Sequence, residues 1–210
     1  MEPKADLHAG AGSFTQWLEQ FHASLTGDHE NTVACGDCIG CCTSSYFIHI
    51  APQDAPALQD VPAELCFPAP GLPPGNLLMG YGPDGHCPMM TQGRCQVYAS
   101  RPVTCRKYDC RIFAAAGILA GGPEKQAINE QVRKWTFRYD SPEARGQHEA
   151  VRKTAAFLTE HRDAFPGGRC PDNPSQIARI AIQAHPVFLR PDLASLSPQD
   201  IALQIIAHST

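Results

Sequence analysis

The chain has 210 residues, with 17 lysines and arginines against 21 aspartates and glutamates, so its formal net charge is −4. This length suits a single domain over 1–210, and a hydrophobic fraction of 43% is enough for a packed core, which argues against a disordered protein. The basic residues are scattered and the mild acidity offers no positive field to phosphates. Nucleic acid is therefore not an expected partner.

The compartment decides what the ten cysteines mean. The first ten residues carry acidic side chains where a signal peptide would be basic, and no long apolar run follows them. The stretch 112–122, which has few polar residues, is about half the length needed to cross a bilayer, so we expect no membrane span. We expect a cytoplasmic protein with reduced thiols, and crowded reduced cysteines are typical of metal binding.

The first predicted element is a helix over 13–26, which Ser13 can cap. Its apolar residues recur at helical spacing: Phe14, Trp17, Leu18, Phe21 and Leu25. A tight loop over 35–42 and a short strand over 46–50 are expected next. A weak helix is expected over 53–59.

The segment 62–85 is rich in proline and glycine, which predicts a surface insertion with little regular structure. After it, the break at 91–94 suits a hairpin, and 99–116 is predicted to be a helix entered through Arg101-Pro102. The part over 123–210 is expected to be a helical scaffold. Its helices, each with proline at the first position, are predicted over 142–164, 174–185 and 197–207.

These patterns predict a fold that is mainly α, with a small cysteine-rich, loop-dominated metal-binding core and one or two short β-hairpins. The cysteine-cluster region spans 33–110 and holds most of the cysteines. The segment 62–85 is its proline-rich insertion. We expect this region and the helical scaffold to pack as one unit.

The strongest motif is the run from Cys35 to Cys42, in which overlapping C-x-x-C steps end in a vicinal pair. Its cysteines are Cys35, Cys38, Cys41 and Cys42. Two residues between thiolates allow a turn to direct both sulfurs at one ion, and the intervening glycines permit a tight backbone. Neighbouring cysteines project differently, so one of the vicinal pair can serve a second metal or bind the same cluster from another side.

A second group of cysteines follows the insertion: Cys87, Cys95, Cys105 and Cys110. If the hairpin folds back on the first loop, the two groups complete a sulfur-rich pocket. Seven or eight sulfurs exceed the need of one tetrahedral ion, so the spacing leaves open two zinc sites, one iron–sulfur cluster with spare thiols, or a polynuclear arrangement. Arg101 and Arg106 lie next to Cys105 in sequence and can offset the thiolate charge.

The loop motif, combined with Cys95-x-x-Tyr98-x-x-Arg101-Pro102-x-x-Cys105-Arg106, resembles the YkgJ-type cysteine-cluster family of zinc- or iron-chelating domains. The resemblance covers about a third of the chain. It implies metal chelation by Cys35, Cys38, Cys41, Cys42, Cys87, Cys95 and Cys105. Cys110 is not part of the family pattern and joins the candidate ligands from its position alone.

The leading hypothesis is a metal–sulfur protein that holds iron, as an iron–sulfur cluster, for electron transfer or a modification reaction. Thiolate-only ligation, an excess of sulfur and neighbouring cations favour it slightly over zinc. The alternative is a structural zinc-binding, non-enzymatic interaction module. The expected partners are the metal ion and a redox or protein partner that the sequence does not identify.

The remaining candidates have simpler interpretations. Cys66 and Cys170 are expected to be isolated thiols, since each lies among turn-forming residues. His49 and His86 are second-choice ligands, because imidazole suits zinc or iron but sulfur is already plentiful.

Overall fold

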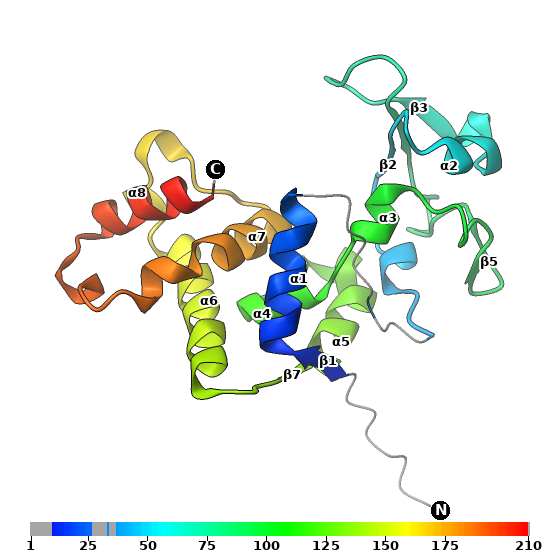
Figure 1. The fold of residues 1–210 in the computed structure, drawn as a ribbon. Coiled ribbons are helices and arrows are strands. Elements are labelled where there is room, and N and C mark those ends of the chain that lie inside the picture. Colours follow the sequence, from blue (N-terminus) through cyan, green and yellow to red (C-terminus); the bar gives the residue numbers. More distant parts are fainter. Residues whose placement is uncertain (1–9, 27–32, 34–36, 210) are drawn as a thin grey trace, which may run out of the picture. The chain divides into compact units, whose positions relative to one another are not determined.

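The structure is a computed structural model that describes residues 10–26, 33 and 37–209. The described chain is mainly helical, with a few short strands in small sheets (Figure 1). Its contacts divide it into two compact units. The helical unit comprises Met1–Ala23, Cys110–Ala120 and Val132–Thr210, and the cysteine unit comprises Ser24–Asp109 and Gly121–Gln131.

The helical unit contains most of the long helices. They are α1 (Phe14–Thr26), α4 (Arg111–Ala116), α6 (Pro142–Glu160), α7 (Pro174–Ala184) and α8 (Pro198–His208). Single 3-10 turns lie between them: η4 (Arg162–Ala164), η5 (Pro166–Gly168), η6 (His185–Leu189) and η7 (Leu193–Ser195). The strands β1 (Gly10–Ser13) and β7 (Thr136–Arg138) pair in parallel.

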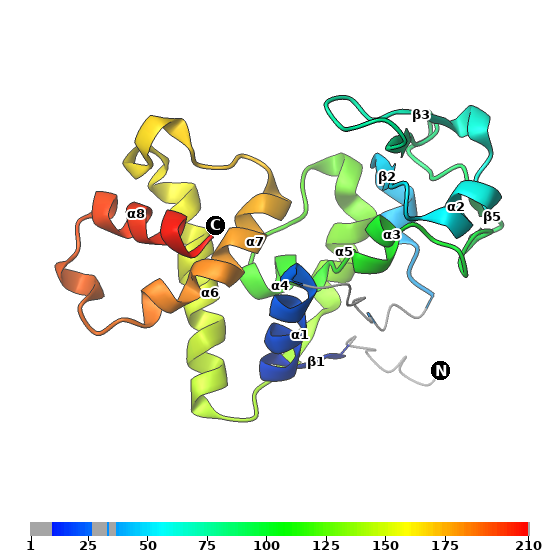
Figure 2. The ribbon, with the colours of Figure 1, turned by 45° about the horizontal axis from the view of Figure 1, so that its top comes forward.

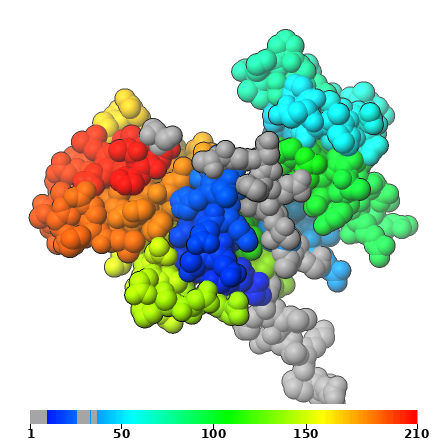
Figure 3. Space-filling model, in the orientation of Figure 1, coloured from blue at the N-terminus to red at the C-terminus, as the bar shows by residue number. Residues whose placement is uncertain are grey.

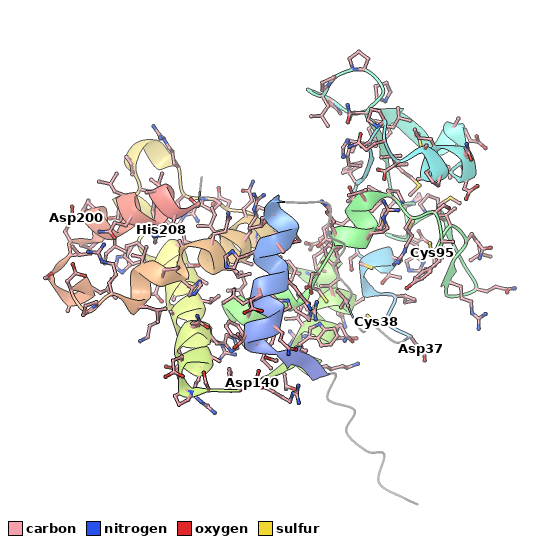
Figure 4. All side chains as sticks on the ribbon, in the orientation of Figure 1. Asp37, Cys38, Cys95, Asp140, Asp200 and His208 are labelled. Atoms are coloured by element: carbon pink, nitrogen blue, oxygen red, sulfur yellow. The ribbon has the colours of Figure 1, made fainter. Side chains whose placement is uncertain are left out.

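Side chains at the helix starts explain why these helices begin where they do. The Ser13 hydroxyl accepts a hydrogen bond from the Gln16 N–H at 3.4 Å, and the Ser141 hydroxyl accepts one from the Ala144 N–H at 3.2 Å. At the start of α8, Ser197 forms a reciprocal capping box with Asp200, which is labelled in Figure 4. Each cap satisfies amides that have no partner in the first turn.

The helical unit has an aromatic core around the start of α1. Phe14 and Trp17 are almost completely buried. The Phe14 ring stacks on His148 of α6 with centroids 4.5 Å apart and meets Phe137 of β7 edge-on at 5.3 Å. Helices α4, α6 and α7 pack against one another and bury Leu158 completely. Apolar burial of this size is the main source of stability in such a unit.

The cysteine unit is built from much shorter elements. Its sheet has the strand order β2 (Ile48–Ile50), β4 (Leu77–Met79) and β3 (Cys66–Pro68), with both pairs antiparallel. Strands β2 and β3 are labelled in Figure 2. A hairpin joins β5 (Met90–Thr91) to β6 (Arg94–Cys95). The helices are α2 (Ala55–Asp60), α3 (Val103–Lys107) and the first part of α5 (Gln126–Lys134). The 3-10 turns are η1 (Gly40–Thr43), η2 (Ala63–Leu65) and η3 (Pro123–Lys125).

Several sequence predictions are confirmed. The helix predicted over 13–26 is α1, and those predicted from 142, 174 and 197 are α6, α7 and α8. The hairpin at 91–94 turns at Gln92 and Gly93, whose φ angles of 51° and 71° suit the two central positions of a type I′ turn. None of the described helices is long and apolar enough to cross a membrane.

The single helix predicted over 99–116 is wrong. The chain forms α3 and α4 instead, separated at Tyr108, whose backbone is extended with φ −69° and ψ 123°. The Tyr108 ring lies 5.7 Å from that of Tyr46. This long-range contact coincides with the break, and local apolar spacing carries no sign of it.

The segment 62–85 contains more regular structure than its composition predicts. Strands β3 and β4 both lie within it, although most of its residues are exposed, as the cyan and teal surface in Figure 3 illustrates. Met79 is buried and stands opposite both Ile48 and Cys66 in the sheet register. A few apolar residues therefore order this segment by pairing with β2, which composition alone does not reveal.

Candidate functional site

The candidate site is formed by cysteines of the cysteine unit. All nine cysteines within the described residues are free thiols. The cysteine unit holds six of the predicted ligands: Cys38, Cys41, Cys42, Cys87, Cys95 and Cys105. Figure 4 labels Cys38 and Cys95 among the side chains of this unit. Cys35 lies outside the described residues, and Cys110 belongs to the helical unit.

The first cysteine loop is held by the 3-10 turn η1. Gly40 is buried there, and a Cβ atom at this position would lie 3.0 Å from the carbonyl oxygen of Ala127 at the start of α5. Only glycine therefore fits this close approach without displacing backbone. The Ser44 hydroxyl donates to the Gly40 carbonyl at 2.5 Å, and the Gly40 N–H donates to the Cys38 Sγ at 3.4 Å. The turn therefore has a defined shape next to its sulfurs.

Two hydrogen bonds join this loop to the chain before the hairpin. The Cys87 N–H donates to the Cys42 carbonyl at 2.7 Å. The Tyr81 hydroxyl, from the segment after β4, donates to the Cys41 carbonyl at 2.6 Å. The segment before the hairpin therefore lies against the first loop. The sequence suggested that the second cysteine group would fold back on the first loop, but it did not predict the hydrogen bond from Tyr81.

The β5–β6 hairpin and helix α3 carry the other sulfurs. Cys95 stands opposite Met90 in the hairpin, and the Met90 N–H donates to the Cys87 carbonyl at 2.9 Å. Cys87, Cys95 and Cys105 all pack against the hydrophobic core of the cysteine unit, which includes Ile48, Ile50 and Met79. Three sulfurs from separate elements therefore share one apolar surface.

The pKa values of these thiols reflect their mutual proximity. A hydrogen bond with Cys41, followed by burial and the neighbouring thiols, raises the pKa of Cys42. The same bond lowers the pKa of Cys41 to about 7, and Arg101 adds to this effect. Burial raises the pKa of Cys105 to about 12, with Cys41, Cys87 and Cys95 contributing. The group resists carrying several negative charges at once unless a cation compensates them.

Asp54 holds the helix that carries Cys105. Its carboxylate is buried and accepts hydrogen bonds from the Ala51 N–H at 3.0 Å and the Val103 N–H at 2.9 Å. The Arg106 guanidinium lies 3.7 Å from the same carboxylate. Asp54 therefore clamps the start of α3 to the end of β2. Sequence reasoning missed it, since its partners on α3 lie far along the chain and no local motif marks them.

The geometry of the thiols differs from that of a loaded metal site. Among residues 10–26, 33 and 37–209, no three His, Cys, Asp or Glu side chains come together as ligands of one ion would. The donor type nevertheless suits soft metals, because thiolates bind zinc, iron–sulfur clusters and copper(I). The backbone brings the cysteine segments together, and their thiols are not arranged around one point.

The other cysteines occupy different surroundings. Cys110 is buried at the start of α4, where its Sγ accepts a hydrogen bond from the Trp135 indole Nε1–H at 3.1 Å. Cys170 is buried as well, and its thiol donates to the Leu158 carbonyl at 3.0 Å. Cys66 packs against the core of the cysteine unit. Burial, followed by the charge of Glu64, raises its pKa.

The two histidine candidates have other partners in the structure. His49 Nε2 lies 2.9 Å from the Asn76 side-chain oxygen, a contact that spans β2 and the residue before β4. His86 Nδ1 lies 3.2 Å from the Asp84 carboxylate on an exposed turn. Each histidine therefore has a partner within the protein that explains its position without a metal.

Comparisons with known proteins do not assign this site. No family model matches the chain. No curated protein and no solved structure matches it either. The function of the site is therefore inferred from its residues and their geometry.

Proposed function

We propose that the chain is a metal–sulfur protein of the YkgJ-type cysteine-cluster kind, with its metal held in the cysteine unit. The observation that carries this proposal is the 2.7 Å hydrogen bond from the Cys87 N–H to the Cys42 carbonyl. It joins the end of the C-x-x-C loop to the first cysteine of the second group, which is distant in sequence.

The proposed ligands come from the small cysteine-rich core: Cys38, Cys41, Cys42, Cys87, Cys95 and Cys105, with Cys35 as the first residue of the motif. Metal binding would require the thiols to turn toward one centre, while η1, the hairpin and α3 hold the backbones that carry them. Cys110 is the weakest candidate, because the Trp135 indole already binds its sulfur. The positive charge of Arg101 lies close enough to Cys41 and Cys105 to favour the thiolate form of each.

Iron is the favoured metal, in the form of an iron–sulfur cluster used for electron transfer or a modification reaction. Such a cluster supplies one-electron chemistry when bound. The chain itself supplies the thiolates, a low-dielectric apolar surface from its core, and the Arg101 charge, all of which tune the potential of such a centre. The expected partner is a redox protein or another protein.

Zinc in a structural role is the second candidate, and the short elements of the cysteine unit favour it. Helix α3 has five residues and the strands have two or three. Units of this kind commonly need an internal crosslink, and a closed zinc site provides one without any catalytic residue. In this case the helical unit would serve to bind a partner.

A cytoplasmic location forms part of the proposal, because free thiols persist in a reducing compartment. We propose neither a membrane nor a nucleic-acid partner, given the net charge of −4.

Anaerobic purification followed by metal analysis and an absorption spectrum tests the proposal. Visible charge-transfer bands with stoichiometric iron and acid-labile sulfide support the cluster. A colourless protein with stoichiometric zinc would replace it with the structural alternative. A preparation with neither metal, after expression with both supplied, would reject both.

Single serine variants then assign the ligands. Cys41→Ser and Cys105→Ser should each reduce metal content well below that of the parent, because a lost thiolate opens a coordination position. Cys170→Ser is the matched control, since its buried thiol already binds the Leu158 carbonyl. Unchanged metal in the first two variants would rule out the proposed ligand set.

A further inference from the structure

A surface hollow of about 470 Å³ lies on the helical unit, and none of the proposed metal ligands lines it. One wall is the turn from Gly168 to Pro171, another is a face of α7, and Ser209 lines the hollow as well. The α7 wall is made by Gln176, Arg179, Ile180 and Gln183. These residues are spaced by three, one and three, which places them on one face of a helix.

The charged groups of this hollow are all positive. Arg169 from the turn and Arg179 from α7 bring two permanent positive charges, and the two glutamines add amide donors. None of the lining residues is acidic. The hollow therefore presents positive charge and N–H donors to whatever enters it.

Ion pairs engage two other arginines of the same unit. Arg162 pairs with Asp172, and Arg190 pairs with Asp192 at 2.6 Å. The guanidinium groups of Arg169 and Arg179, by contrast, have no hydrogen-bond or ion-pair partner within the part of the chain that the structure describes. The acidic residue nearest in sequence, Asp172, is already engaged by Arg162. The positive charges of Arg169 and Arg179 therefore have no carboxylate partner within the described residues.

We propose that this hollow binds a small dianion whose charged oxygens bridge Arg169 and Arg179. Guanidinium forks match the oxygens of phosphate and carboxylate groups and bind them through paired hydrogen bonds. The Gln176 and Gln183 amides can donate to the same oxygens. Ile180 and Pro171 line the hollow as well and suit the carbon skeleton of such a ligand. A phosphate monoester and a dicarboxylate share this chemistry.

The position of the hollow explains how such a ligand would act on the chain. It would crosslink α7, shown in orange in Figure 1, to the turn that follows α6. A ligand that binds only the folded unit stabilises it by mass action. The proposal is independent of the metal, because no cysteine among its proposed ligands lines the hollow.

Calorimetric titration of the full-length chain at constant ionic strength tests the proposal, with glycerol 3-phosphate, succinate and inorganic phosphate as separate probes. We expect saturable binding of at least one dianion, and the probe that binds best identifies the source of the charge. Arg169→Gln and Arg179→Gln should each weaken binding by about 10- to 100-fold, the usual effect of losing a charge-assisted hydrogen bond. Both side chains are exposed, so the fold should tolerate the changes.

Two further variants make the outcome decisive. Gln183→Glu places a negative charge in the hollow and should abolish binding, while helix propensity changes little. Arg133→Gln, at an exposed arginine of the same unit outside the hollow, should bind like the parent. Amide shifts in NMR spectra during the titration should fall on residues 168–183. Absence of saturable binding by all three probes would overturn the proposal, as would an equal loss in Arg133→Gln.

Discussion

The helical unit and the cysteine unit achieve order by different means. The helical unit uses capped helices of up to 19 residues around completely buried aromatic and aliphatic side chains. The cysteine unit uses strands of two or three residues and a small core shared with its sulfurs. Local propensity and apolar burial suffice for the first, whereas the second depends on long-range backbone bonds and, in our proposal, on metal.

The largest expected effect is a selective loss of structure on metal removal. Treatment with a chelator under reducing, oxygen-free conditions should abolish hydrogen-exchange protection in the cysteine unit, because metal binding contributes directly to its folding. Protection in α6 and α7 should persist. Mass spectrometry of proteolytic fragments can follow both units in one sample. Retained protection around α3 and the hairpin in metal-free protein would show that the unit needs no such crosslink.

The next effect concerns the core of the helical unit. Phe14→Ala should reduce the free energy of unfolding by about 3–5 kcal/mol, since a completely buried ring that stacks on His148 leaves a cavity. Urea unfolding followed by circular dichroism measures this loss. Phe47→Ala is the matched control in the cysteine unit, where the ring is 67% exposed, and it should cost less than about 1 kcal/mol. Similar losses in both variants would contradict the contrast between the units.

A smaller effect is expected at the turn of the first cysteine loop. Gly40→Ala should destabilise the protein by about 1–3 kcal/mol, because the new Cβ would press on the Ala127 carbonyl at 3.0 Å. The melting temperature of the metal-loaded protein reports the change. Gly146→Ala, inside α6 with no atom within 4 Å of the new Cβ, should instead raise stability by up to about 1 kcal/mol. If both changes move the melting temperature in the same direction, the close approach at Gly40 does not affect stability.

The smallest effect is a pH dependence of the helical unit. Burial, followed by the charge of Arg152, lowers the pKa of His148 to about 4. The unfolded chain, with an ordinary histidine pKa near 6.5, then takes up the proton first, so stability is complete above about pH 6.5 and is lost as the pH falls toward 4. The loss should reach about 1 kcal/mol by pH 5.5.

Urea titrations at pH 7 and pH 5.5 measure this difference. His148→Gln should reduce it, and the part that remains belongs to His22 and His185, whose pKa values burial also lowers. His86→Gln, which changes an exposed side chain, should leave the difference unchanged. An identical pH dependence in the parent and in His148→Gln would assign the effect to other groups.

The features that the sequence predicted well are those encoded within a few residues. Helices α1, α6, α7 and α8 carry their own caps and apolar spacing, and the hairpin carries Gln92 and Gly93 at its turn. Caps and turns involve residues that are close in sequence, so these elements could be predicted without knowledge of tertiary contacts. The spacing of the cysteines similarly selected the candidate site residues before any fold was known.

Only the tertiary structure decided which distant segments meet. The Cys42–Cys87 bond, the clamp of Asp54 on α3 and the close approach of Gly40 to Ala127 each join residues with no shared local pattern. The same holds for the hydrogen bond from Trp135 to Cys110, which gives that sulfur a partner in the helical unit. Such contacts depend on chain closure and packing across the whole fold. Their energies are therefore properties of the folded unit, and no window of sequence contains them.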